Sequence, residues 1–175
     1  MIYGLGRSEE LVGEVLKEFK RDEFVVATKG AQHWYEDGTV KTDNRPEYLR
    51  EAVEKSIDNN ISFIPYGPLS FGLLSGSFTK DFKLDAQDWR QLLPLFQGEQ
   101  FQQAIETVDK LKEFAVQKEI SLPNLALAWL LAQDGVDAVI PGGKRKERIR
   151  ENVQASKIGL SKEELNTLED ILSSY

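Results

Sequence analysis

The residues with the clearest chemical potential form a cationic cluster towards the C-terminal end of the chain. Cations occupy four of five consecutive positions after a Pro-Gly-Gly turn, at Lys144, Arg145, Lys146 and Arg148. Cations at a helix N-terminus oppose the helix dipole, so helix stability alone does not favour them there. Free backbone N–H groups together with cationic side chains bind phosphate. From residue types alone, a phosphate site and a solvated basic helix start are about equally well supported.

A second candidate is the glycine-rich stretch that follows the apolar run 61–65. Tyr66 offers a flat aromatic face, and Gly67 and Gly72 would let a ligand approach the backbone closely. Taken alone, this pattern is more often an ordinary strand end and turn. Its value lies in its combination with the cationic cluster.

The elements that must position these residues alternate along the chain. Short apolar runs predict buried strands near 24–28, 61–65 and 136–140. Apolar residues at helical spacing predict helices over 9–19, 46–57, 101–118, 123–132, 146–155 and 162–172. Ser8 and Ser161 are predicted N-caps, and Glu164 completes a capping box with Ser161.

Two irregular stretches separate these elements. We interpret 31–45 as a polar loop with an Asp37-Gly38 turn, and 73–99 as a long binding loop or lid. The alternation predicts βαβ units with a parallel sheet, whose ligands lie at the carboxyl ends of the strands. Lys29, Tyr66 and the turn at Pro141 all fall at such ends.

The segment 140–152 resembles the aldo-keto reductase signature I-P-G-A-K-R-x-x-Q-x-x-E-N. The resemblance implies that Lys144, Arg145 and Arg148 hold the 2′-phosphate of NADPH, with Gly142 in the turn. Glu151 and Asn152 would contact the adenine. Arg148 stands where many members have Gln, although other members also have Arg.

The segment 63–76 is similar to the family motif Y-x-P-L-x-x-G-L-L-x-G. The resemblance implies that Tyr66 stacks on the nicotinamide ring. The backbone of the residues that follow it would wrap the pyrophosphate: Gly67, Pro68, Leu69 and Gly72. Together with the first motif, at the expected order and distance, this segment strongly favours the family interpretation.

The segment 2–13 resembles the family pattern around the general-acid tyrosine, and 26–30 matches the strand that carries its lysine. Tyr3 and Lys29 would then be catalytic. A tyrosine titrates near 10, and a neighbouring ammonium favours its phenolate, which brings the pKa closer to the working pH. The alternatives from structure alone are a frayed terminal aromatic and an exposed strand-end lysine. His33 is interpreted as a loop residue rather than the catalytic histidine of the family.

These resemblances imply NADPH-dependent reduction of aldehydes or ketones by an α/β protein of the (β/α)8 TIM-barrel type. The barrel is expected to be incomplete, in a single domain over 1–175. The resemblance comes in two pieces, 2–57 and 58–175, with a join of non-contiguous family segments near 56–60. The family's catalytic aspartate and histidine belong to parts that are missing. A catalytically inactive NADP(H)-binding or scaffold protein is therefore the alternative function.

Three explanations of the missing parts are open. The sequence could join the ordered segments of a full reductase, which we favour because each motif still fits an intact active site. It could instead be a shortened chain that pairs with a copy of itself, so self-association stays open. It could also be a degraded gene product without activity.

The composition of the chain argues against some classes of binding partner. The formal net charge of -7 argues against broad nucleic-acid binding. The chain has no cysteine, and no apolar run reaches the ~18 residues of a membrane span. The first residues do not read as a signal peptide. We therefore expect a cytoplasmic protein that acts on small carbonyl compounds, with no metal site.

Overall fold

The computed structural model describes residues 7–23, 25, 27, 32–34, 39–42, 54 and 63–173. The chain divides into two compact units, Met1–Ile61 and Ser62–Tyr175. Across the described residues, no helix combines the length and the apolar character that a membrane span requires.

The first unit contains helix α1 (Arg7–Leu16), a 3-10 turn η1 (Arg21–Glu23) and a short hairpin. Helix α1 confirms the predicted first helix, although it begins before Ser8, which therefore lies inside the helix instead of capping it. Its apolar side chains at Leu11, Val12 and Val15 stay about half exposed. The helix is amphipathic, but its apolar face does not belong to a buried core.

The polar stretch 31–45 was wrongly predicted to be a loop throughout. Strands β1 (Gln32–Trp34) and β2 (Val40–Thr42) pair antiparallel, with His33 opposite Lys41. The strands flank the Asp37-Gly38 turn signal, which is typical of a hairpin. Sequence periodicity missed them because three residues are too few to show an alternation of polar and apolar side chains.

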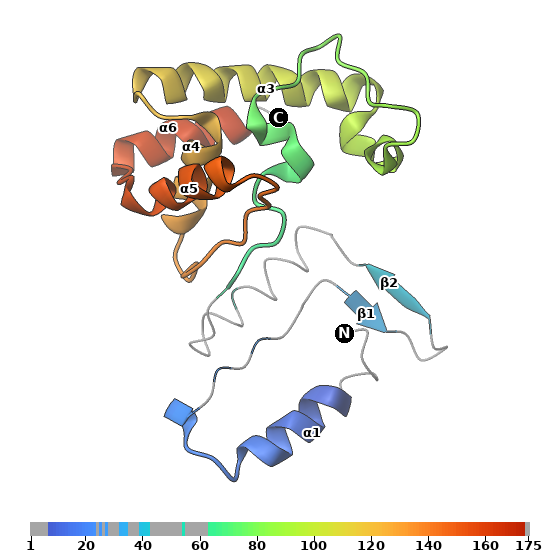
Figure 1. Ribbon diagram of the computed structural model, residues 1–175, viewed down its shortest axis with the longest axis vertical. Coiled ribbons are helices and arrows are strands. Elements are labelled where there is room, and N and C mark those ends of the chain that lie inside the picture. Colours follow the sequence, from blue (N-terminus) through green and yellow to red (C-terminus); the bar gives the residue numbers. More distant parts are fainter. Residues whose placement is uncertain are drawn as a thin grey trace. The chain divides into compact units, whose positions relative to one another are not determined.

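The second unit is built around α3 (Gly98–Gln117), α4 (Leu122–Leu131), α5 (Lys146–Gln154) and α6 (Lys162–Ser173), with a 3-10 turn η5 (Ala155–Lys157) between the last two. These helices gather in one cluster (Figure 1). All four predicted helices are confirmed to within a few residues at each end. The apolar stripe of α3 faces the core, where Phe101, Ile105, Val108 and Leu111 are buried. Helix α5 differs, because none of its residues is buried.

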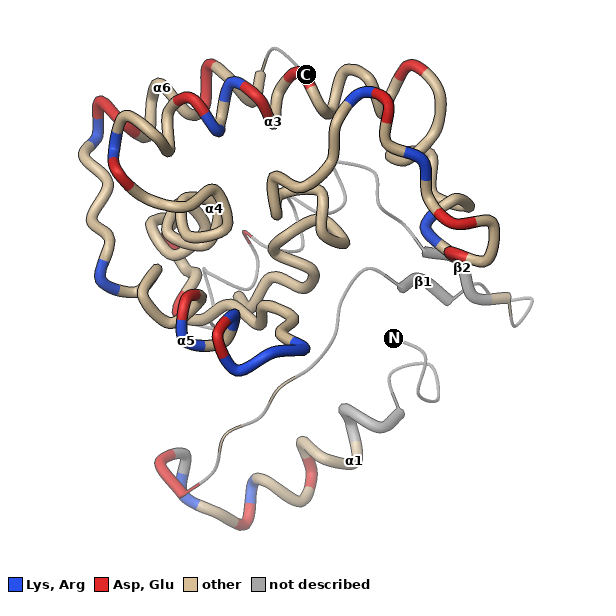
Figure 2. Tube along the Cα trace, turned by 45° about the horizontal axis from the view of Figure 1, so that its top comes forward, with Lys and Arg blue, Asp and Glu red and all other residues tan. Residues whose placement is uncertain are grey.

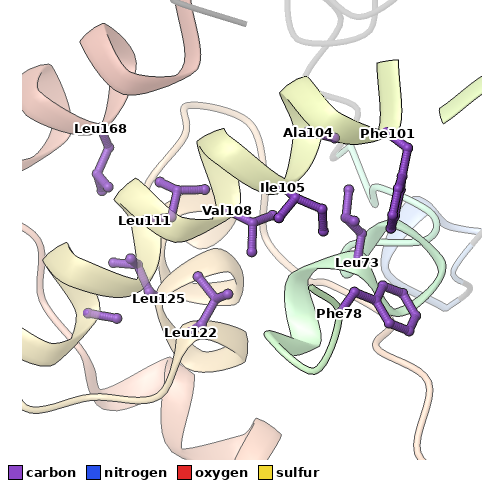
Figure 3. Close-up of a cluster of buried hydrophobic side chains, with 11 residues drawn as sticks. Leu73, Phe78, Phe101, Ala104, Ile105, Val108, Leu111, Leu122, Leu125 and Leu168 are labelled. Carbon is purple, nitrogen blue, oxygen red and sulfur yellow. The ribbon is translucent and has the colours of Figure 1, made fainter. Parts of the chain in front are cut away.

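Figure 3 shows how the core of this unit is assembled. Leu111 of α3, Leu125 of α4 and Leu168 of α6 point towards one another, and Leu125 and Leu168 are almost completely buried. Leu73 and Phe78 extend the core towards Phe101. This packing of the helices against the segment after Tyr66 fixes where that segment lies.

Helix caps confirm two signals read from the sequence. The Ser161 backbone N–H donates to Glu164 Oε2 at 2.8 Å, and the Glu164 N–H donates to Ser161 Oγ at 3.2 Å, which is the predicted capping box. Lys118 of α3 also binds Glu164, with Nζ 2.6 Å from Oε1. The capping box therefore also ties α6 to α3.

The predicted strands are only partly realised. Phe63 bridges Val136 and Tyr66 bridges Ile140, both in parallel register, as isolated bridges. The prediction of strands buried on both faces is wrong for the described residues: Val25 is 96% exposed and in no strand, and Ile140 is 65% exposed. A parallel strand is buried on both faces only where neighbouring strands and covering helices surround it. Among the described residues, no third segment pairs with 63–66 or 136–140.

The long segment 73–99 is irregular, as predicted. The 3-10 turn η2 (Ser70–Ser75) leads into it, and η3 (Trp89–Leu92) and η4 (Pro94–Phe96) lie within it, joined by turns and bends. The predicted helix over 46–57 lies outside the described residues, apart from Glu54, which is helical.

Candidate nucleotide-binding edge

The two segments with the strongest predicted chemistry lie side by side. The Phe63 N–H donates to the Gly135 carbonyl at 2.7 Å, and the Tyr66 bridge to Ile140 continues the parallel register. Parallel neighbours leave the sheet at the same end. The glycine-rich stretch after Tyr66 and the Pro-Gly-Gly turn after Ile140 therefore begin at one edge, which we call the nucleotide edge.

The first half of this edge presents an aromatic ring above a tight backbone turn. The Tyr66 side chain is 89% exposed, so its ring face is accessible, and Pro68 behind it is buried. Gly67 has a φ of 67°, a conformation that glycine adopts without strain. Leu69, which is half-buried, leads into the next turn.

That turn has an unusual backbone. Ser70, Phe71 and Gly72 have φ values of 47°, 55° and 98°, so three consecutive residues are left-handed. Left-handed conformations cost non-glycine residues roughly 1–2 kcal/mol each. Such strain persists only where the surroundings determine it, and it clusters at functional sites. We refer to these three residues as the left-handed turn.

The second half of the edge is the cationic turn, residues 142–148, at the start of α5. Its Lys144, Arg145 and Arg148 side chains are exposed, and Figure 2 shows the run of cations leading into the helix. Arg145 occupies the N-cap position without a side-chain hydrogen bond to the helix. The first N–H groups of α5 are thus not capped by that residue, and cations surround them. This combination suits an anion.

Close packing explains one glycine in this turn. A Cβ on Gly143 would lie 2.8 Å from Ile149 Cγ1, whereas a Cβ on Gly142 would meet nothing within 4 Å. Gly143 therefore lets the turn fold back on the first turn of α5. This contact sets the direction in which Lys144 and Arg145 leave the turn.

Arg148, the predicted phosphate ligand, forms an ion pair with Glu151, the predicted adenine contact. Arg148 Nη1 donates to Glu151 Oε2 at 2.8 Å, one helical turn along α5. Both side chains are partly exposed, and Asn152 beside them is half-buried. A ligand phosphate at Arg148 would therefore compete with Glu151 for the guanidinium.

Sequence reasoning missed a second charged group next to this edge, formed by Asp88 and Arg90. The Arg90 guanidinium donates to Asp88 through Nε at 3.0 Å and through Nη2 at 2.6 Å. Its Nη1 donates to the Phe71 carbonyl at 2.9 Å. The signal in the sequence is an Asp-x-Arg spacing inside a long loop, but only the fold brings Arg90 to the left-handed turn.

The hydrogen bonds from Arg90 and, to a smaller extent, the charge of Lys144 in the cationic turn contribute to the pKa of Asp88. The Arg90 side chain donates hydrogen bonds to the Asp88 carboxylate, and these lower its pKa from 3.8 to about 2. The Arg90 backbone N–H and the charges of Arg90 and Lys144 act in the same direction, against the effect of burial. The same hydrogen bonds raise the pKa of Arg90. Asp88 is thus charged at any working pH.

The predicted catalytic residues cannot be placed. Tyr3 and Lys29 lie outside the described residues, so their geometry relative to the nucleotide edge stays a prediction. His33 lies in strand β1. The described residues therefore include the candidate binding residues, and the roles of Tyr3 and Lys29 stay predictions from the sequence.

Comparison with known proteins adds two findings from sequence. The model of the aldo/keto reductase family matches residues 1–59 and 57–173. The Schizosaccharomyces pombe aldo-keto reductase yakc, whose name specifies NADP(+), is 38% identical over 104 residues, which cover 59% of this chain and 31% of the relative. An NADH-specific methylglyoxal reductase of Escherichia coli is 31% identical over 118 residues, which cover 65% and 36%.

The chain spans about a third of the length of these two relatives. Among solved structures, a glycerol dehydrogenase from Gluconobacter oxydans matches with a TM-score of 0.63 and 21% sequence identity. The match covers 98% of this chain and 79% of that protein. At this identity the likeness concerns the fold, and it agrees with the predicted TIM-barrel class.

Proposed function

Because the chain belongs to the aldo/keto reductase family, a family of oxidoreductases, we propose that it binds NADPH at the nucleotide edge and reduces aldehydes or ketones to alcohols. The observation that carries the proposal is the parallel pairing of Tyr66 with Ile140. It brings an exposed aromatic ring, a strained backbone turn and a cationic helix start to one edge. These three surfaces match, in turn, the nicotinamide ring, the pyrophosphate and the 2′-phosphate of NADPH.

The residues present fit such a cofactor. Lys144, Arg145 and Arg148 are exposed cations at the start of α5, where a ribose phosphate gains from both charge and backbone N–H groups. Tyr66 provides a ring face for stacking, and the left-handed turn after it would lie along the pyrophosphate. The N–H groups of Ser70 and Gly72 already donate to the carbonyls of Gly67 and Leu69, so the turn would supply its shape and not these two donors. Glu151 and Asn152 lie one turn along the same helix, where they would meet the adenine.

NADPH, when bound, supplies the hydride that converts the carbonyl carbon to an alcohol carbon. The chain itself supplies the proton, which Tyr3 donates to the carbonyl oxygen. Lys29 lowers the pKa of that phenol, since an ammonium beside it stabilises the phenolate. Both roles rest on the resemblance of 2–13 and 26–30 to the family motifs.

Cofactor choice follows from the cationic turn. One relative is named for NADP(+) and the other for NADH, so a nicotinamide cofactor is common to both. NADPH differs from NADH by the 2′-phosphate alone. Three exposed cations on one short segment have their clearest use in binding that phosphate, which favours NADPH for this chain.

The cofactor assignment is tested by titrating the purified chain with NADPH and NADH. Lys144→Ala and Arg148→Ala are each expected to weaken NADPH binding by about 1.5 kcal/mol, roughly 10-fold, because each removes a charged hydrogen bond. NADH binding should change little. Lys157→Ala is the control, since it removes an exposed cation after α5. Equal losses for both cofactors would contradict a 2′-phosphate site.

The same preparation separates an enzyme from an inactive binding protein. NADPH and methylglyoxal are mixed with the chain, and the absorbance of the reduced nicotinamide is followed. Turnover that Tyr3→Phe abolishes, with NADPH affinity kept, supports catalysis with Tyr3 as the acid. Tight NADPH binding without turnover supports the inactive alternative instead.

A further inference from the structure

The left-handed turn is held in place from the loop that follows it. Arg90 Nη1 donates to the carbonyl of Phe71, the middle residue of the turn. The Phe71 ring also meets Trp89 edge to face, with centroids 5.2 Å apart and planes at 88°. Two neighbouring residues of η3 thus contact Phe71: Arg90 binds its backbone carbonyl, and Trp89 packs against its ring.

The backbone at position 72 favours glycine, because its φ of 98° is strained for any other residue. A Cβ there would lie in ordinary van der Waals contact with Arg90 Nη1, at 3.4 Å, so Arg90 packs directly against the turn. Backbone bonds from Gly72 and Leu74 to the Leu69 carbonyl, at 2.9 and 3.3 Å, close the turn on itself. The turn and Arg90 are therefore fitted to each other.

Arg90 is in turn fixed from three sides. The Asp88 carboxylate accepts hydrogen bonds from Arg90 Nε and Nη2. The ring centroids of Phe78 and Phe96 lie 5.6 and 5.8 Å from the guanidinium carbon of Arg90. The side chains of Asp88 and Arg90 are 19% and 25% exposed, so water screens their pairing only in part. Phe78 belongs to the hydrophobic core and Phe96 packs against it, so the guanidinium is anchored to the body of the unit.

We propose that Arg90 is a positioning residue, held by Asp88, which keeps the left-handed turn in the shape that receives the cofactor's pyrophosphate. The proposal rests on the proposed function, because it deepens the assignment of the same edge. The strain of two left-handed non-glycine residues needs an external restraint, and Arg90 supplies it at the Phe71 carbonyl. Arg90 acts through this turn and is distinct from the cations of the cationic turn.

Two ligands distinguish this positioning role from a general loss of structure at the binding site. NADP+ carries a pyrophosphate, whereas adenosine 2′-monophosphate has only the adenine and the phosphorylated ribose. Binding of both to the full chain is measured by calorimetry or competition. Arg90→Gln is expected to raise the Kd for NADP+ about 10-fold, since it removes a charged hydrogen bond and the Asp88 pair. The Kd for adenosine 2′-monophosphate should stay within about 2-fold of the wild type.

Asp88→Asn provides a milder second variant. It keeps the size of the side chain but loosens Arg90, so the same selective loss for NADP+ is expected, at a smaller fold-change. Lys80→Gln is the control, because it removes the exposed Lys80–Glu106 ion pair in the same loop without touching the turn. In turnover, Arg90→Gln should raise KM for NADPH with little change in kcat.

Each result has a definite meaning. A loss restricted to NADP+ in both variants supports the proposal. Unchanged NADP+ binding, or equal loss of both probes in Asp88→Asn, overturns the positioning role while leaving the cofactor site intact. A wild-type chain that binds neither probe overturns the proposed function and the role of Arg90 together.

Discussion

At the scale of single residues, the nucleotide edge depends on two contacts: the bridge between Tyr66 and Ile140, and the hydrogen bond that Arg90 donates to the Phe71 carbonyl. Tyr66 and the cationic turn were expected at the carboxyl ends of parallel strands, and the parallel Tyr66–Ile140 bridge shows in addition that the two segments lie side by side. Parallel topology alone carries that prediction. Arg90 has no such topological signal, since its partner Phe71 lies 19 positions earlier in an irregular segment.

The Asp88–Arg90 pair makes a testable contribution to acid stability. The pKa of Asp88 in the folded chain is about 2, against an ordinary value of 3.8, chiefly because the Arg90 side chain donates hydrogen bonds to it. Between these values the unfolded chain binds more protons than the folded one. The pair therefore stabilises the fold fully above about pH 4, and this contribution is lost as the pH falls towards about 2.

Asp88→Asn should consequently make the free energy of unfolding depend less on pH between about pH 4 and pH 2. Urea unfolding of the wild type and the variant is compared at several pH values between about 4.5 and 2.5. The free energy difference between the two proteins is expected to shrink as the pH falls. Other carboxylates titrate in both proteins and cancel in the difference. A difference that stays constant across the window would show that the pair does not act through the charge of Asp88.

At the scale of elements, helices were predictable and strands were not. Helices α3 and α6 carry their own amphipathic stripes, so local sequence predicts that both exist. The capping box also fixes the start of α6, whereas α3 has no side-chain cap and begins three residues before its predicted start. A strand's burial depends on its neighbours, and Ile140 shows the consequence: an apolar residue in a predicted buried strand that is 65% exposed. The hairpin β1–β2 was missed because its strands are too short to show a period.

The turn before α5 carries a prediction at this scale. Gly143→Ala would place a methyl group 2.8 Å from Ile149 Cγ1, so the Ile149 side chain or the turn must shift. That should cost about 1 kcal/mol, since an off-rotamer β-branched side chain on a helix has few alternatives. Gly142→Ala should cost far less, because a Cβ there meets nothing within 4 Å. Chemical denaturation of both variants measures the difference.

The same two variants report on binding. Gly143 lets the cationic turn pack against the start of α5. Gly143→Ala should therefore also weaken NADPH binding more than Gly142→Ala does. Equal effects of the two alanines on stability would mean that the turn does not pack closely on Ile149.

At the scale of the whole molecule, the match to the family and the division of the structure fall at similar places. The family model matches 1–59 and 57–173 separately, and the two compact units are Met1–Ile61 and Ser62–Tyr175. We propose that this boundary is the join of non-contiguous family segments predicted near 56–60. The barrel class was predictable from motif order. The exposure of apolar side chains such as Val25 and Ile140 was not, because no local pattern specifies what covers them.

The second unit is expected to fold by itself, because its core cluster lies wholly within it, from Leu73 to Leu172. A fragment of Ser62–Tyr175 should give a helical circular dichroism spectrum and one cooperative unfolding transition. Leu168 is 1% exposed, so Leu168→Ala should cost about 2–5 kcal/mol, equally in the fragment and in the full chain. A fragment that stays unfolded, or a cost of Leu168→Ala that differs between the two, would mean that the first unit or a second copy completes this core. Size-exclusion chromatography of the full chain would then distinguish those two sources.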